Sequence, residues 1–108
     1  MSAKILFWLF TLIGAGLEIT GDIFFKKWVI ENKPFLVWMG FIVYLIATVF
    51  WAISLKYEML SKAISIFTIL NLVIVSLVGV LIFKENISLL SKIGIILGVI
   101  SIILIQRG

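Results

Sequence analysis

The sequence predicts an all-α membrane protein with four transmembrane helices. Of its 108 residues, 64% are hydrophobic and 13% are charged, which leaves too little polar surface for a soluble domain. The apolar residues form four runs, each long enough for a helix that crosses a hydrocarbon core about 30 Å thick. Short polar segments separate these runs. We therefore expect a single transmembrane domain over residues 1–108, with spans at about 4–28, 35–55, 60–83 and 87–105.

The first span carries two acidic residues, Glu18 near its middle and Asp22 one helical turn later. An acid at the centre of a transmembrane helix costs roughly 2.5–3.5 kcal/mol, so it usually faces protein or water and serves a function. We expect Glu18 to bind protons or a substrate, and the alternative is a neutral Glu18 that only joins helices by hydrogen bonds. For Asp22, a functional role and a structural pairing with Lys26 are equally open.

Glu18, Asp22 and Lys26 recur every four residues, so on a helix they form one column, which we call the polar column. Small residues, Gly14 among them, lie on or beside the same face. Small side chains let another helix or a ligand approach the backbone closely. The first span is therefore expected to present a narrow polar face on an otherwise apolar cylinder.

The second span begins after Pro34, a residue suited to the first turn of a helix. Tyr44, Thr48 and Trp51 are spaced to fall on one stripe of this span. A Tyr hydroxyl donates hydrogen bonds and an indole offers a π face, so this stripe could hold an organic cation against a carboxylate. Packing between helices is the alternative for each residue.

The third and fourth spans differ from the first, because they carry small and hydroxyl-bearing residues in place of acids. In the third span, Ser, Thr and Gly residues form a stripe typical of close helix contacts. In the fourth span, Gly94, Gly98 and Ser101 form a helix-packing face that could join two subunits.

Several function classes are excluded by composition. The chain has no Cys and no His, which excludes disulfides, thiol chemistry and His-based metal or proton sites. No set of nucleophile, base and orienting residue can be assembled, so we expect no enzyme, no cofactor and no metal site. The net charge of +4 is spread over the span ends, which indicates membrane anchoring and argues against nucleic-acid binding.

The basic residues are nearly balanced between the two sides of the membrane, so the positive-inside rule gives no clear orientation. We expect the chain to insert both ways and to form an antiparallel homodimer, which supplies the inverted repeat of alternating-access transporters. Such a dimer would bring two copies of Glu18 to one midplane chamber. One side holds Lys4, Lys56, Lys62 and Arg107, and the other holds Lys26, Lys27, Lys33, Lys84 and Lys92.

A further set of residues matches a known pattern. It comprises the segment Glu18-Ile19-Thr20-Gly21-Asp22-Ile23-Phe24-Phe25-Lys26, Tyr44, Tyr57, Phe83-Lys84-Glu85 and Gly94. With the four short spans, these residues resemble the small multidrug resistance family of the drug/metabolite transporter superfamily. The resemblance extends without gaps over nearly the whole chain.

The resemblance implies an antiparallel homodimer in which Glu18 binds either protons or substrate cations. It further implies that Tyr44 lines the chamber and that Gly94 lies at the dimer contact. Ile64 and Phe67 stand where the family carries substrate-stacking Tyr and Trp residues. The predicted chamber lining is thus Gly14, Tyr44, Thr48, Trp51, Ile64 and Phe67, and the predicted dimer contact is Gly94, Gly98 and Ser101.

The expected function is a proton-coupled antiporter of the cell (inner) membrane that exports hydrophobic or polyvalent organic cations, with Glu18 and Asp22 as the binding acids. Its expected partners are protons, small organic cations, the lipid bilayer and a second copy of the chain. The third span, with Asn71 and Phe83-Lys84-Glu85, also resembles the small subunits of lipid-linked aminosugar flippases and other metabolite transporters of the superfamily. One alternative is therefore a flippase subunit or another small metabolite transporter. Another is a structural membrane protein whose polar residues only join helices.

Overall fold

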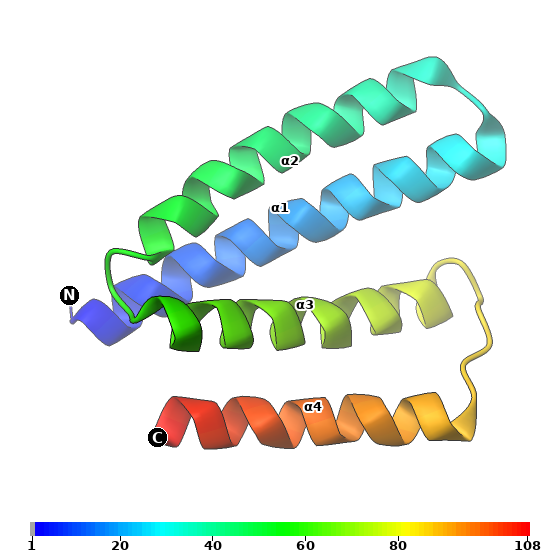
Figure 1. Ribbon diagram of the computed structural model, residues 1–108. Helices are drawn as coiled ribbons and strands as arrows, with labels where there is room; N and C mark the ends of the chain where they lie inside the picture. The colour runs from blue at the N-terminus through cyan, green and yellow to red at the C-terminus, as the bar shows by residue number, and fades with distance from the viewer. Residues whose placement is uncertain (1) are drawn as a thin grey trace. The chain divides into compact units, whose positions relative to one another are not determined.

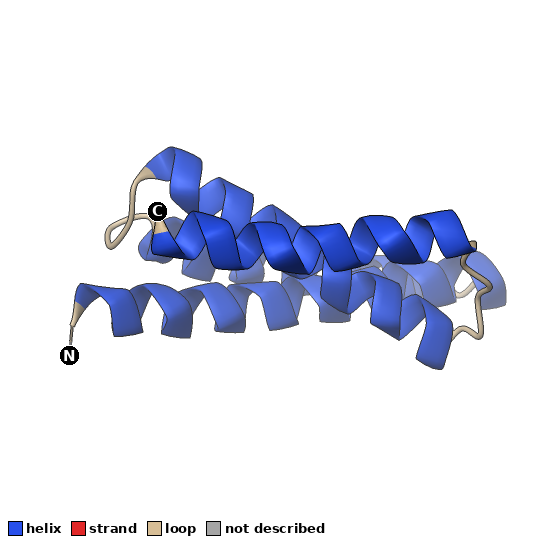
Figure 2. Cartoon of the chain, turned by 90° about the horizontal axis from the view of Figure 1, so that it is seen from below, coloured by secondary structure: helices blue, strands red, loops and turns tan. Residues whose placement is uncertain are grey.

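The computed structural model describes residues 2–108, and that part of the chain contains four helices and no strand (Figures 1 and 2). The helices are α1 (Ala3–Glu31), α2 (Pro34–Ser54), α3 (Leu60–Leu81) and α4 (Leu89–Arg107). Each is long and apolar enough to cross a membrane. The predicted all-α fold with four transmembrane helices is therefore confirmed, and the chain has the character of a multi-pass membrane protein.

Local capping explains where the helices begin and end. α1 continues to Glu31, three residues past the expected 28, because Asn32 then adopts a left-handed conformation with φ of 57° and donates its N–H to the Trp28 carbonyl. Pro34 is the first residue of α2, as expected. α4 begins at Leu89, since Ser88 caps it by accepting a hydrogen bond from the Ser91 N–H at 3.1 Å.

The chain forms two helical hairpins, and each packs within itself. In the first unit, which ends at Met59, α1 packs along α2, and in the second, Leu60–Gly108, α3 packs along α4. The connections 32–33 and 82–88 are short, so the two helices of each hairpin run antiparallel (Figure 1).

Glycines set the distance between α1 and α2. A methyl group built on Gly14 would lie 3.4 Å from the Trp51 backbone nitrogen and 3.5 Å from the Ala47 carbonyl oxygen. At Gly40, a methyl group would lie 2.6 Å from Cε1 of the Phe25 ring, which is too close for atoms that do not bond. A methyl group at Gly14 would thus be in ordinary van der Waals contact with the α2 backbone, whereas at Gly40 the absence of a side chain leaves the space that the Phe25 ring occupies.

Aromatic rings fill the space beside these glycines. Phe25 packs edge-on against Tyr44 and Phe41, with ring centroids 5.2 Å and 5.6 Å apart. Toward the other end of the hairpin, Phe10 stacks on Phe50 and on Tyr57 at 6.2 Å and 6.0 Å. Such ring pairs contribute roughly 0.5–1.5 kcal/mol each beyond burial of their area.

The second hairpin is held by different contacts. A methyl group built on Gly98 would meet the Ile69 side chain at 3.3 Å, so this part of α4 lies close against α3. Near the chain end, the Lys62 ammonium donates to the Gly108 carbonyl at 3.2 Å. α4 has no buried residue along its described length, which leaves most of its aliphatic surface open.

We predict that Gly40→Ala lowers the free energy of unfolding by about 1–3 kcal/mol, because the added methyl group overlaps a Phe25 ring that Tyr44 and Phe41 hold in place. The measurement is unfolding in mixed detergent and dodecyl sulfate micelles, followed by far-UV circular dichroism. The matched control is Gly16→Ala, since a methyl group there meets nothing within 4 Å. Equal destabilisation by both variants would show that glycine contact does not set the α1–α2 distance.

Candidate functional site

The two acids of the first span lie one turn apart in the middle and second half of α1. Glu18 and Asp22 are both partly buried, although the helix around them is largely apolar. Their spacing of four residues puts them on one face of the helix, as the polar column predicts. The hairpin thus carries two carboxyl groups within a helix that is long and apolar enough to cross a membrane.

Tyr44 of α2 donates a hydrogen bond from its hydroxyl to the Asp22 carboxyl. Both Asp22 and Glu18 also interact electrostatically with the Tyr44 phenol. These three residues, which we call the acid–tyrosine cluster, come from two helices: Tyr44 of α2 contacts Asp22 of α1, and Glu18 lies one turn before Asp22 on the same face of α1. The cluster combines two acidic groups, one hydroxyl and one aromatic ring, which are the groups that bind protons and organic cations.

The position of Tyr44 depends on the residues around its ring. Gly21 leaves the space that the ring occupies, since a methyl group there would overlap the ring and would lie 3.3 Å from the Gly40 carbonyl oxygen. Phe25 contacts the ring edge-on from the next turn of α1. Gly21 and Phe25 of α1 therefore fix the position of the Tyr44 ring, and the ring hydroxyl points toward Asp22.

The rest of the predicted α2 stripe is divided between the helix contact and the surface. Trp51 is half-buried, and its backbone lies against Gly14. Thr48 is exposed, and its hydroxyl donates to the Tyr44 carbonyl of its own helix at 2.9 Å. Gly14, Tyr44 and Trp51 thus lie at the contact between α1 and α2. Thr48 lies outside that contact, with its side chain exposed.

Thr11 extends the polar face of α1 two turns before Glu18. It is fully buried, and its hydroxyl oxygen has no hydrogen-bond partner among residues 2–108. An unsatisfied buried hydroxyl costs about 1–3 kcal/mol, so this position favours a water molecule or a polar ligand atom.

The predicted lining residues of the third span differ in exposure. Phe67 is buried at 8% exposure, and Ile64 is 49% exposed, although both lie in the first half of α3. They belong to the second unit, and their place in a chamber with Glu18 stays a prediction.

The residues predicted for a dimer contact lie along α4. Gly94 is open, since a methyl group there meets nothing within 4 Å, whereas Gly98 faces Ile69 of α3. The Ser101 hydroxyl donates to the Leu97 carbonyl of its own helix at 2.9 Å. Gly98 therefore contributes to packing within one chain, and a contact between chains through this face stays a prediction.

Gly40 and Phe25 are residues of the site that the sequence analysis did not single out. Phe25 fills the space above Gly40 and contacts Tyr44, so both residues help to hold the acid–tyrosine cluster. The available signal was the spacing of Gly40, Tyr44 and Ala47, which fall on one helical stripe that includes two small residues.

No group of three or more His, Cys, Asp or Glu side chains able to hold a metal occurs among the described residues. No family model, curated protein or solved structure matches this chain. The chemistry of the acid–tyrosine cluster is therefore the basis on which a function can be assigned.

We predict that Tyr44→Phe and Asp22→Ala are energetically coupled, because the first removes the donor and the second removes the acceptor of the same hydrogen bond. A double-mutant cycle on the free energy of unfolding should give a coupling of about 0.6–1.7 kcal/mol, the range for such bonds in membrane helices. Asp22→Ala with Thr48→Val is the control cycle, since the Thr48 hydroxyl donates within its own helix. Its two effects should add to within about 0.5 kcal/mol. Additive effects in both cycles would contradict the Tyr44–Asp22 contact.

Proposed function

We propose that the chain is a proton-coupled antiporter that exports hydrophobic or polyvalent organic cations, of the small multidrug resistance type. The observation that carries this proposal is the acid–tyrosine cluster inside an apolar helical hairpin. Carboxyl groups at this depth are costly, at roughly 2.5–3.5 kcal/mol each when placed at a helix centre. A bound proton or a bound cation relieves this cost, so both are ligands of the same groups.

Competition between the two ligands supplies the coupling. A proton on the Glu18 carboxylate leaves a neutral group that no longer attracts a cation, and a bound cation displaces that proton. Either ligand neutralises the site and permits a change of access, whereas the empty, charged site resists it because a bare charge would have to cross hydrocarbon. One direction of the change releases the cation, and the other releases the proton.

The Tyr44 ring adds recognition of organic cations. Its hydroxyl is engaged by Asp22, which fixes the plane of the ring relative to α1. A cation over an aromatic face gains roughly 0.5–2 kcal/mol, depending on how far it is desolvated. A hydrophobic cation therefore gains from both the ring and the carboxylates, whereas a small hydrated ion gains less.

An antiparallel homodimer would complete the site. A single α1–α2 hairpin encloses little space, and two copies in opposite orientation would supply two Glu18 carboxyls and the inverted symmetry of alternating access. The open surface of α4 and the near balance of basic residues support this assembly.

We predict that Glu18→Gln abolishes cation-driven proton flux in proteoliposomes. The assay follows lumenal pH with a dye while a panel of quaternary ammonium, polyamine and guanidinium cations is added. Flux should fall to the level of protein-free vesicles, because glutamine cannot exchange a proton for a cation. The matched control is Thr20→Val, which removes an exposed hydroxyl bonded to its own helix in the same part of α1 and should retain flux.

Unchanged flux in Glu18→Gln would exclude Glu18 as the exchange group. Absence of flux across the whole panel, with the native chain shown to be folded, would overturn the antiporter proposal. A requirement for an unlike partner chain would then favour a flippase subunit.

We predict that Asp22→Asn discriminates substrates by charge. Loss of the second acid should weaken apparent affinity for dications such as polyamines about tenfold more than that for monovalent quaternary ammonium ions, a difference of about 1.4 kcal/mol. Concentration series for both cation classes in the same vesicles give the comparison. Glu31→Gln is the control, since it removes an exposed acid that pairs with Lys33 at 3.4 Å outside the cluster. Equal weakening for both classes would show that Asp22 acts only through the fold.

A further inference from the structure

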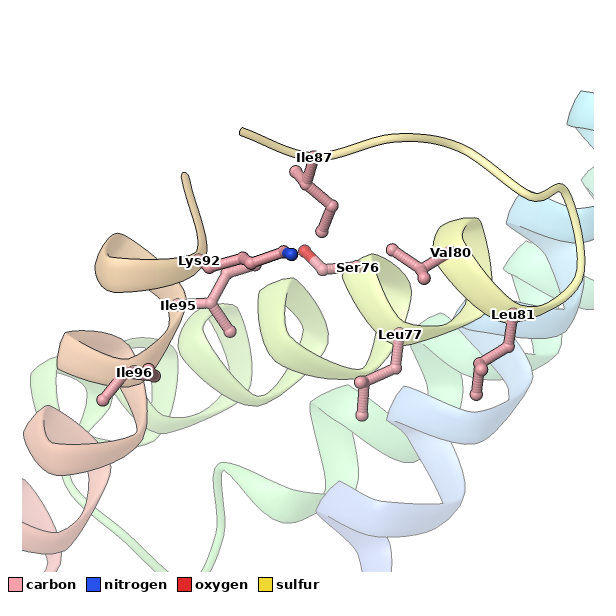
Figure 3. Close-up of a pocket in the computed structure, with 8 residues that line it drawn as sticks. All are labelled: Ser76, Leu77, Val80, Leu81, Ile87, Lys92, Ile95 and Ile96. Carbon is pink, nitrogen blue, oxygen red and sulfur yellow. The ribbon is translucent and has the colours of Figure 1, made fainter. Parts of the chain in front are cut away.

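The second hairpin contains a pocket of about 350 Å³ near the end of α3 and the beginning of α4 (Figure 3). The last turns of α3, the connecting segment and the first turns of α4 line it. Ser76 and Lys92 supply the polar side chains. The other lining residues are all aliphatic, namely Leu77, Val80, Leu81, Ile87, Ile95 and Ile96.

The pocket lies at the level where lipid head groups meet the hydrocarbon core. α4 has 19 residues and is therefore about 28 Å long, close to the hydrocarbon thickness of about 30 Å. Lys92 is the fourth residue of α4, within about one turn of its beginning. The Lys92 side chain therefore starts close to the interface, and the aliphatic walls of the pocket lie beside it.

The pocket opens toward the surroundings of the chain. Leu77, Leu81 and Ile96 are exposed by 54%, 74% and 59%, whereas Val80 and Ile95 are partly buried and form the inner wall. In a membrane, such an opening is filled from the side by an acyl chain. A water-soluble ligand would instead have to displace lipid to enter it.

Lys92 is the one charged residue among the eight that line the pocket. Figure 3 shows Lys92 extending over the pocket with its ammonium directed toward the Ser76 hydroxyl. None of the eight lining residues is acidic. Cations of the kind bound by the acid–tyrosine cluster would be repelled here, and a phosphate would be attracted.

We infer that this pocket binds an anionic phospholipid, with its phosphate on the Lys92 ammonium and one acyl chain along the aliphatic wall. Basic pockets between transmembrane helices bind anionic head groups, and a charge-assisted hydrogen bond from ammonium to phosphate is strong in such surroundings. A zwitterionic lipid gains less, because no acidic lining residue pairs with its own ammonium. This site is independent of the transport function proposed above.

Native mass spectrometry of the full chain in detergent micelles tests the inference. The chain is titrated with phosphatidylglycerol and with phosphatidylcholine of identical acyl chains, and binding of the first should be about tenfold tighter. Glycerol phosphate, which carries the head group without acyl chains, should not compete at the same concentration. Effective competition by glycerol phosphate would indicate a site for soluble phosphate and overturn the inference.

Charge variants separate this pocket from general attraction to basic residues. Lys92→Gln should reduce the lipid preference to within about twofold, and Lys92→Arg, which keeps the charge, should retain it. Lys84→Gln is the matched control, since Lys84 is exposed in the connection between α3 and α4 and does not line the pocket. A preference that persists in Lys92→Gln, is absent in Lys92→Arg or falls equally in Lys84→Gln would overturn the inference.

A second pair of variants tests the acyl-chain wall. Val80→Phe should lower binding of both lipids about tenfold, because the ring occupies the pocket. Leu90→Phe adds the same ring at a position that is 79% exposed and outside the lining, and it should leave binding unchanged. Equal binding by Val80→Phe and the native chain would show that the lipid does not enter the pocket.

Discussion

The close approach of α1 and α2 at Gly21 and Gly40 is the constraint on which the candidate site depends. Without side chains at these two positions, the Tyr44 and Phe25 rings fit between the helices. In this position of the Tyr44 ring, its hydroxyl donates a hydrogen bond to Asp22. In a bilayer no hydrophobic effect drives helices together, because lipid is as apolar as their side chains, so contact at small residues carries much of the association. The same close approach of α1 and α2 therefore packs the hairpin and positions its polar side chains.

Energetic magnitudes indicate why this arrangement suits a binding site better than a structural contact. An acid at the centre of a span, where Glu18 lies, costs roughly 2.5–3.5 kcal/mol, and Asp22 lies one turn from it. A hydrogen bond such as Tyr44 to Asp22 returns only about 0.6–1.7 kcal/mol in membrane helices. Glu18 adds a second carboxyl beside the first. The hydrogen bond thus offsets only part of that cost, which is why we propose that a proton or a cation neutralises the acids.

The two hairpins carry opposite polar chemistry. The first places acids within its helix contact, whereas the second places Lys92 over an aliphatic pocket and leaves α4 without buried residues. α4 meets α3 closely at Gly98, where Ile69 lies opposite, and the pocket is found toward the connecting segment. The proposed cation site and the proposed lipid site therefore lie in different hairpins and use groups of opposite charge.

The sequence by itself determined the four helices and the column formed by Glu18 and Asp22. Both follow from local rules, since span length and the 3.6-residue period depend only on neighbours along the chain. Only the tertiary structure decided that Tyr44 donates a hydrogen bond to Asp22, from which it is 22 residues distant in sequence. The same holds for the Phe25 ring, which lies against Gly40. These contacts depend on how far one helix is rotated and shifted against another. The packing of side chains between the two helices fixes this rotation and shift. The sequence period of one helix shows which residues share a face, but it does not show how that face is aligned with the neighbouring helix.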